Sequence, residues 1–212
     1  MNTLQAILDS GVIAIIRCDS GEGLLDTARA LAKGGVRALE VTLTTPGALE
    51  AIRSISQQSD GQFATGAGSI LDAESARMAI LAGAEFLVCP GLDMGVIQMA
   101  KRYGRVVLPG ALTPTEVIAA WSAGADLVKI FPASIGGPDY IKALRGPLPQ
   151  VRMVPVGGVE VANAGAYIKA GASAVAMGGS LVNAKLIAAG QWDQITQTAQ
   201  AALQAVSQAR RS

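Results

Sequence analysis

The stretch AGADLVKIFP, residues 123–132, joins the end of one predicted helix to a predicted strand without a loop. Its Gly124 is typical of a residue that ends a helix at positive φ, and the apolar run that follows is typical of a buried strand. The same plan recurs at three more glycines, Gly35, Gly83 and Gly171, which precede the apolar runs 36–43, 85–88 and 173–177. This repeated unit indicates an α/β fold with parallel strands.

Four further β-branched runs, each followed by a turn and a segment of helical period, lie between these units, at 12–16, 63–65, 105–108 and 151–155. Eight strands then recur every ~20 to 27 residues with a helix between them, which favours a closed (β/α)₈ TIM barrel. We expect one domain spanning residues 1–212. An open, flavodoxin-like sheet is the alternative. In a barrel, the functional groups would lie at the carboxyl ends of the strands.

Charge and hydropathy exclude several kinds of partner. The 17 basic and 16 acidic residues leave a net charge of +1, and no basic stripe interleaved with aromatic residues suits nucleic acid. No apolar run reaches the roughly 18 residues of a membrane span, and residues 1–10 lack the pattern of a signal peptide. We therefore expect no nucleic acid, no membrane and a cytoplasmic location.

The chain has no histidine, which excludes Ser-His-Asp and Cys-His catalysis and imidazole metal sites. Acid and base chemistry must then fall to Glu, Asp, Lys, Tyr or water. We expect no metal and no cofactor. The two cysteines, Cys18 and Cys89, adjoin apolar runs and are predicted to be small buried hydrophobic residues without a disulfide.

Lys129 is placed within an otherwise apolar strand, close to its carboxyl end. Burying an ammonium is costly, and desolvation lowers a lysine pKa towards the free amine that attacks a carbonyl. Lys129 is therefore a candidate nucleophile that forms a Schiff base. The alternative is a lysine that extends to the rim of the barrel or forms a salt bridge.

Glu40 lies inside the second predicted strand, where a carboxylate needs a partner. If it faces Lys129 across the mouth of the barrel, each group perturbs the pKa of the other, and Glu40 can move protons beside an imine. A purely structural ion pair is the alternative.

Two glycine-rich turns follow the last two predicted strands. Gly157 and Gly158 follow the seventh, and Gly178, Gly179 and Ser180 follow the eighth. In barrels, these loops commonly bind phosphate through backbone N–H groups. The alternative is that the glycines only form tight turns.

Two further positions at strand ends suit an acidic ligand. Gly68 and Ser69 close the third strand, and Ser69 offers a hydroxyl, while Arg17 ends the first strand and can pair with a carboxylate or a phosphate. Either feature can equally be part of the rim.

These residues resemble the 2-keto-3-deoxy-6-phosphogluconate and 4-hydroxy-2-oxoglutarate aldolases. The resemblance spans nearly the whole chain through motifs in the same order, which are Glu40-Val-Thr-Leu, Gly66-Ala-Gly-Ser, Cys89-Pro-Gly-Leu, Lys129-Ile-Phe-Pro-Ala, Pro155-Val-Gly-Gly-Val and Gly178-Gly-Ser. It implies a metal-free class I aldolase that forms pyruvate and glyceraldehyde 3-phosphate, and an assembly as a homotrimer.

The resemblance also implies a role for each motif. Lys129 forms the imine with the 2-keto group, and Glu40 moves protons on the enamine and the leaving hydroxyl. Gly68 and Ser69 hold the pyruvyl carboxylate, and Pro90 packs beside the imine. The same resemblance assigns Gly158, Gly179 and Ser180 to the phosphate. We also expect Gly157 and Gly178 at the phosphate, and Arg17, Thr44, Phe131 and Val156 at the substrate.

Three positions depart from the family pattern. Thr44 stands where many relatives have an arginine that binds the substrate carboxylate, and Ser69 replaces the usual threonine. Val156 replaces a threonine that can bond the C4 hydroxyl of one epimer, and aldolases of the 6-phosphogalactonate type carry valine there. Gluconate, galactonate and hydroxyoxoglutarate substrates all remain open.

Two other kinds of function share the predicted phosphate turns. A sugar-phosphate isomerase or epimerase normally relies on histidine, which this chain lacks. A non-catalytic barrel that binds a phosphate ligand is the remaining alternative, and it gives no reason for a lysine in a strand.

Overall fold

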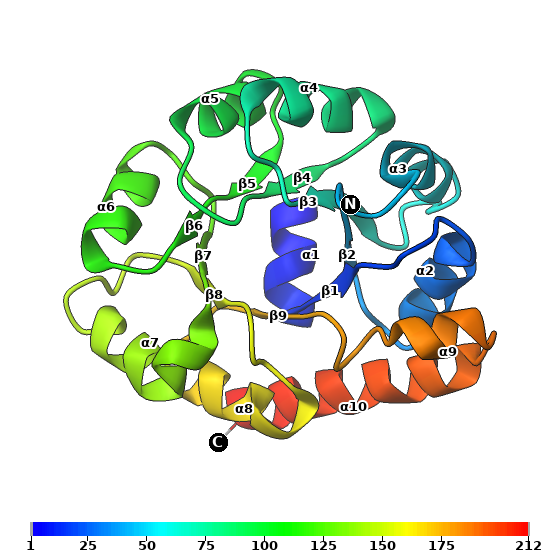
Figure 1. The fold of residues 1–212 in the computed structure, drawn as a ribbon. Helices are drawn as coiled ribbons and strands as arrows, with labels where there is room; N and C mark the ends of the chain where they lie inside the picture. The colour runs from blue at the N-terminus through cyan, green and yellow to red at the C-terminus, as the bar shows by residue number, and fades with distance from the viewer. Residues whose placement is uncertain (1, 212) are drawn as a thin grey trace.

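The structure, a computed structural model, describes residues 2–211. In this α/β fold the strands lie around a common centre, and the helices other than α1 lie outside them (Figure 1). The strands are β1 (Val12–Ile16), β2 (Ala38–Thr42), β3 (Ala64–Gly68), β4 (Phe86–Val88), β5 (Val106–Leu108), β6 (Gly110–Ala111), β7 (Val128–Ile130), β8 (Met153–Pro155) and β9 (Val175–Met177). The helices are α1 (Thr3–Ser10), α2 (Leu24–Lys33), α3 (Ala48–Gln57), α4 (Ala73–Ala82), α5 (Met94–Arg102), α6 (Pro114–Ser122), the 3₁₀ turn η1 (Ala133–Ile135), α7 (Gly137–Arg145), α8 (Val161–Lys169), α9 (Ala184–Ala188) and α10 (Trp192–Arg211).

The strands pair in parallel in two sheets. One has the order β5-β4-β3-β2-β1-β9 and the other has the order β6-β7-β8. An isolated parallel bridge between Val156 and Ala176 links the end of β8 to β9. The predicted parallel α/β fold is confirmed, but the predicted strand 105–108 continues past Pro109 as a separate strand, β6. Proline has no N–H to donate, so it interrupts the ladder at this point.

Side chains alternate between the inside of the ring of strands and the surrounding helices, as the period of two requires. On β1, Ile13 and Ile15 belong to a buried inner cluster, whereas Val12, Ala14 and Ile16 pack in a larger outer cluster under the helices. The inner cluster also contains Phe86, Leu108, Leu127 and Val154. The space within the strands is therefore a packed core, and only its ends are available for a site.

Helix α1 covers the amino-terminal end of this inner cluster. Ile7 belongs to the cluster and is fully buried, and Leu4 and Leu8 pack against it. Figure 1 shows α1 lying across the centre of the ring of strands. Because α1 leads directly into β1, it occupies the end of the sheets where the strands begin, and a site is left to the carboxyl ends.

The predicted helix ends are largely confirmed. The four terminating glycines, Gly35, Gly83, Gly124 and Gly171, have φ values of 98°, 109°, 95° and 103°. Thr113 and Glu116 form a capping box at the start of α6. Helix α3 begins at Ala48, two residues after Pro46, with Gly47 at φ 71° as its N-cap.

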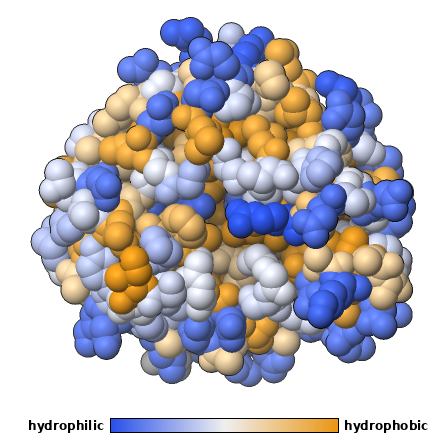
Figure 2. All heavy atoms as spheres, viewed as in Figure 1, coloured by the Kyte–Doolittle hydropathy of each residue, from blue (hydrophilic) through white to orange (hydrophobic). Residues whose placement is uncertain are grey.

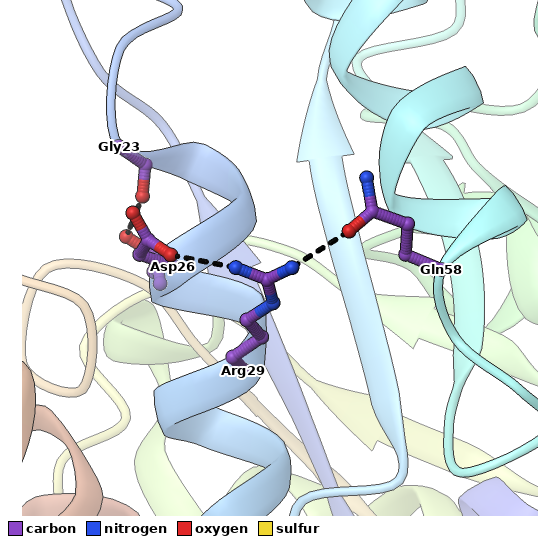
Figure 3. Close-up of polar contacts among 5 residues, drawn as sticks. Gly23, Asp26, Arg29 and Gln58 are labelled. Atoms are coloured by element: carbon purple, nitrogen blue, oxygen red, sulfur yellow. Dashed lines mark hydrogen bonds and ion pairs between the residues drawn. The ribbon is translucent and has the colours of Figure 1, made fainter.

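Neighbouring helices are also joined at the surface. Arg29 of α2 bonds Asp26 on its own helix at 3.1 Å and Gln58 at the end of α3 at 2.7 Å (Figure 3). Such exposed contacts contribute little free energy.

Figure 2 shows the same face as Figure 1, where strongly hydrophilic residues near the centre lie against hydrophobic ones. No helix among residues 2–211 combines the length and the apolar character needed to cross a membrane.

Both cysteines are free thiols. Cys89 is buried as predicted, whereas Cys18 is only half-buried, because it lies in the loop after β1 rather than in the strand. Burial raises the pKa of Cys89 to about 12, which keeps its thiol protonated.

Candidate active site

Strand alternation determines where Lys129 points. Its neighbours Val128 and Ile130 pack in the outer cluster, and Leu127, two residues earlier, belongs to the inner cluster. Lys129 therefore points inward, one layer above Leu127. Its side chain is 6% exposed, so the strand holds an amine at the top of an apolar core.

Glu40 has the same orientation on β2. Leu39 and Val41 pack outward, and Ala38 belongs to the inner cluster, so Glu40 points inward and is 2% exposed. The space for this carboxylate depends on Gly68 of the adjacent strand, because a Cβ there would lie 1.8 Å from Glu40 Oε1. Gly68, which was predicted as a site residue, therefore lies directly beside the Glu40 carboxyl group.

A cavity of about 420 Å³ lies above these two residues. Twelve of the fourteen predicted site residues line it, namely Arg17, Glu40, Ser69, Pro90, Lys129, Phe131, Val156, Gly157, Gly158, Gly178, Gly179 and Ser180. Another cavity, of about 510 Å³, is lined by residues such as Cys18, Asp19 and Trp192 and contains none of the fourteen.

Two predicted residues do not line the cavity. Gly68 lies behind Glu40, as described above. Thr44 is exposed beyond the end of β2, and its hydroxyl bonds that of Thr42 at 3.0 Å. Thr44 is not among the residues that line the cavity, so the structure does not bring it into the group. Its contact with the substrate stays a prediction.

Burial is the main influence on the Lys129 amine. It lowers the pKa of Lys129, while Glu40 and Cys89 raise it and Arg17 lowers it further. Lys129 Nζ lies 4.6 Å from the centre of the Phe131 ring, which supplies an apolar neighbour. Among residues 2–211, the ion pairs within 4.0 Å involve other residues, so Lys129 is not held in a tight salt bridge.

Burial has the opposite effect on the Glu40 carboxyl. It raises the pKa of Glu40 to about 7, against the lowering influence of Lys129 and Arg17. Glu40 Oε2 is buried and has no hydrogen-bond partner within the described part of the chain. A buried carboxyl with an unused oxygen and a pKa near neutrality is suited to accept and return a proton.

The two glycine turns present backbone donors to the cavity. The structure gives no acceptor to the N–H groups of Gly158, Val159, Gly179 and Ser180 among the residues it describes. The Ser180 hydroxyl donates to Val159 O at 3.0 Å and thereby joins the two turns. Four unpaired N–H groups near the start of α8 form a suitable site for an anion.

Sequence reasoning missed four residues that line the cavity, which are Ile15, Val159, Glu160 and Ala176. Ile15 and Ala176 could have been found, because strand alternation places them on the inner face beside Glu40 and Val156. Glu160 follows the glycine turn with no signal of its own. Asn163 was also missed, although it bonds the backbone of that turn.

The geometry agrees with comparisons to known proteins. The sequence profile of the KDPG and KHG aldolase family matches residues 4–198. A 2-dehydro-3-deoxy-phosphogluconate aldolase of Treponema pallidum is 39% identical over 197 residues, which are 92% of this chain and 93% of that protein.

Solved structures give the same result. A structure described as native KDPGal has a TM-score of 0.88 and 33% identity, covering 95% of this chain and 96% of its own. A KDPG aldolase from Legionella pneumophila, with pyruvate captured as a covalent carbinolamine intermediate, has a TM-score of 0.86 and 28% identity, covering 95% and 98%. From the family profile and these likenesses along nearly its whole length, the chain is a member of the KDPG and KHG aldolase family.

Proposed function

We propose that this protein is a class I aldolase that reversibly cleaves a 2-keto-3-deoxy-6-phospho sugar acid into pyruvate and glyceraldehyde 3-phosphate. The observation that carries the proposal is the buried Lys129 amine, whose pKa is lowered, in one cavity with Glu40 and the two glycine turns. The Treponema pallidum relative is named for this type of activity, and the Legionella pneumophila structure holds pyruvate covalently.

Lys129 is the nucleophile in this proposal. Its neutral amine attacks the C2 carbonyl of the substrate to form a carbinolamine, and loss of water gives the imine. The protonated imine then draws in the electron pair of the C3–C4 bond as that bond breaks. The lowered pKa of Lys129 supports this role, because it increases the fraction of free amine near neutral pH.

Glu40 acts as the base and then as the acid. Its carboxylate takes the proton of the C4 hydroxyl, directly or through water, while the C3–C4 bond breaks to give the aldehyde and the enamine of pyruvate. The same proton is returned to C3 of the enamine, and hydrolysis of the imine releases pyruvate. A pKa of about 7 suits both halves of this cycle.

Arg17 and Ser69 are the groups that we assign to the substrate carboxylate, since both line the cavity and Thr44 does not. Ser69 adopts a left-handed conformation, with φ 58°, that directs the chain around the end of β3. Pro90 and Phe131 provide the apolar walls near Lys129. We assign the phosphate to the turns of Gly157, Gly158, Gly178, Gly179 and Ser180, whose free N–H groups support the assignment.

A second substrate class is favoured by Val156. This residue lines the cavity, is 5% exposed and has no group that can bond a C4 hydroxyl. The native KDPGal structure is among the similar folds. Cleavage of the galactonate epimer is therefore the alternative, with 4-hydroxy-2-oxoglutarate as a further candidate, and pyruvate release from each substrate separately would rank the three.

The proposal also includes the architecture that the sequence predicts. The bridge from Val156 to Ala176, together with the continuity of β5 and β6 across Pro109, supports closure of the two sheets into one (β/α)₈ barrel within a single domain, residues 1–212. A homotrimer is part of the same proposal, and it is supported by the exposed hydrophobic side chains of Leu71, Met78 and Leu81, which lie on or just before α4. The cytoplasmic location stays a prediction.

The decisive experiment is incubation with pyruvate and sodium borohydride, followed by peptide mass spectrometry. We expect a reduced pyruvyl adduct on Lys129 and none in Lys129→Ala. Lys142→Ala, which changes an exposed lysine on α7, is the matched control and should retain the adduct. If the folded native chain formed no adduct, the chain would instead be a non-catalytic barrel that binds a phosphate ligand.

A further inference from the structure

Two consecutive peptide groups of the turn after β8 are held by side chains from outside the turn. Asn163 Nδ2 donates to Gly158 O at 2.9 Å, and Asn163 Oδ1 accepts from the N–H of Glu160 at 2.8 Å. The carbonyl between them, Val159 O, accepts from Ser180 Oγ at 3.0 Å. Three of the four polar groups in these two peptides are therefore already bonded.

The remaining group is the N–H of Val159. A trans peptide is planar, and its N–H points opposite to its C=O. Because Gly158 O is directed at Asn163, the N–H of Val159 must point away from α8. Both Gly158 and Val159 line the cavity, and this N–H has no acceptor among the described residues.

The turn needs such an external restraint because of its glycines. Gly157 and Gly158 have φ values of 89° and 76°, a region that other residues rarely adopt. A Cβ on Gly158 would also lie 2.7 Å from the Cβ of Ser134, so a stiffer residue cannot replace the glycine there. Glycine allows the backbone conformation of this turn but does not restrict the rotation of its peptide planes.

We propose that Asn163 is a positioning residue of the phosphate subsite, which fixes the Gly158–Glu160 turn so that the N–H of Val159 faces the ligand. This inference rests on the proposed function. To fix the turn in this way, a side chain must supply one donor and one acceptor at a fixed spacing, and the Asn163 amide does so. An aspartate can accept from Glu160 but cannot donate to Gly158, and alanine can do neither.

The test compares phosphorylated and unphosphorylated ligands in Asn163→Ala and Asn163→Asp. In the synthetic direction, with pyruvate, we expect the KM for glyceraldehyde 3-phosphate to rise about tenfold in Asn163→Ala, as the loss of two neutral hydrogen bonds implies. The KM for unphosphorylated glyceraldehyde and the yield of the borohydride adduct should change less than about twofold. In Asn163→Asp, the KM should likewise rise for the phosphorylated aldehyde and stay nearly constant for the unphosphorylated one.

The matched control is Asn2→Ala, which removes the N-cap of α1 at the other end of the barrel, where Asn2 accepts from Gln5 N. It should leave both KM values unchanged. An equal rise for the two aldehydes in Asn163→Ala would reduce Asn163 to a structural role and overturn the proposal, as would no change in either.

Calorimetric titration with inorganic phosphate separates this inference from the proposed function. We expect Asn163→Ala and Asn163→Asp to weaken phosphate binding whether or not the native chain forms an imine. An unchanged Kd in both folded variants would overturn the role of Asn163, while a missing adduct in the native chain would overturn only the aldolase reaction.

Discussion

The cavity has a strand part and a turn part that differ in their physical character. In the strand part, Lys129 and Glu40 are 6% and 2% exposed, and burial shifts the pKa of each towards neutrality. In the turn part, Gly158, Gly179 and Ser180 are exposed and offer backbone N–H groups whose partial charges do not titrate. One part is suited to moving protons, and the other is suited to holding an anion at any working pH.

The largest effect that this comparison predicts is on Glu40. Glu40→Gln removes the proton acceptor while keeping the size of the side chain, so we expect kcat to fall about 100- to 10,000-fold. Trapping of pyruvate on Lys129 should persist, although more slowly. Steady-state cleavage and borohydride trapping measure the two effects.

The same substitution in the turn part is the matched control. Glu160 lines the cavity but is exposed, so Glu160→Gln should change kcat by less than about threefold. Equal losses in the two variants would show that burial does not distinguish the two parts.

A smaller effect is expected on the pH profile. Glu40 has a raised pKa of about 7 and must be ionised to act as a base, so protonation below pH 7 removes the active form. We expect protonation of Glu40 to lower kcat/KM for cleavage about tenfold for each pH unit below this value, in addition to the effect of protonating the Lys129 amine. In Glu40→Gln the Glu40 contribution should be absent, so the residual activity should fall less steeply with decreasing pH. An acidic limb near pH 4.5 in the native chain would mean that burial does not control Glu40.

The smallest effect is predicted for the turn part. Gly158→Ala introduces a Cβ at φ 76° and 2.7 Å from Ser134, so the turn must shift. We expect the KM for the phosphorylated substrate to rise about tenfold, with kcat nearly unchanged, if the turn contributes binding in both the ground state and the transition state.

Gly61→Ala separates strain from function in this experiment. Gly61 has a similar φ of 71° and nothing within 4 Å of an added Cβ. It should lower the free energy of unfolding by about 1 kcal/mol without a change in KM, because the cost is confined to the backbone. An equal rise in KM for both variants would contradict the assignment of the turn.

Much of the site could be predicted because its residues violate the pattern of their surroundings. Lys129 and Glu40 are charged residues in apolar strands, and period-two alternation then directs both inward. Asn163 broke no pattern, since an asparagine in the first turn of a helix is ordinary. The spacing of Glu160 and Asn163 fits a capping box, which accounts for one of the two hydrogen bonds to the preceding turn, but no spacing rule specifies the bond to Gly158 O.

The alternation of strands and helices, the terminating glycines and the identity of the acid and the amine could be predicted, because they depend on local periodicity and on the cost of burying charge. The folded chain was needed to show that Thr44 stays outside the cavity, that Gly68 makes room for Glu40, and that the strand near Pro109 divides in two. These outcomes depend on contacts between residues far apart in the chain, where a displacement of an ångström decides which groups meet.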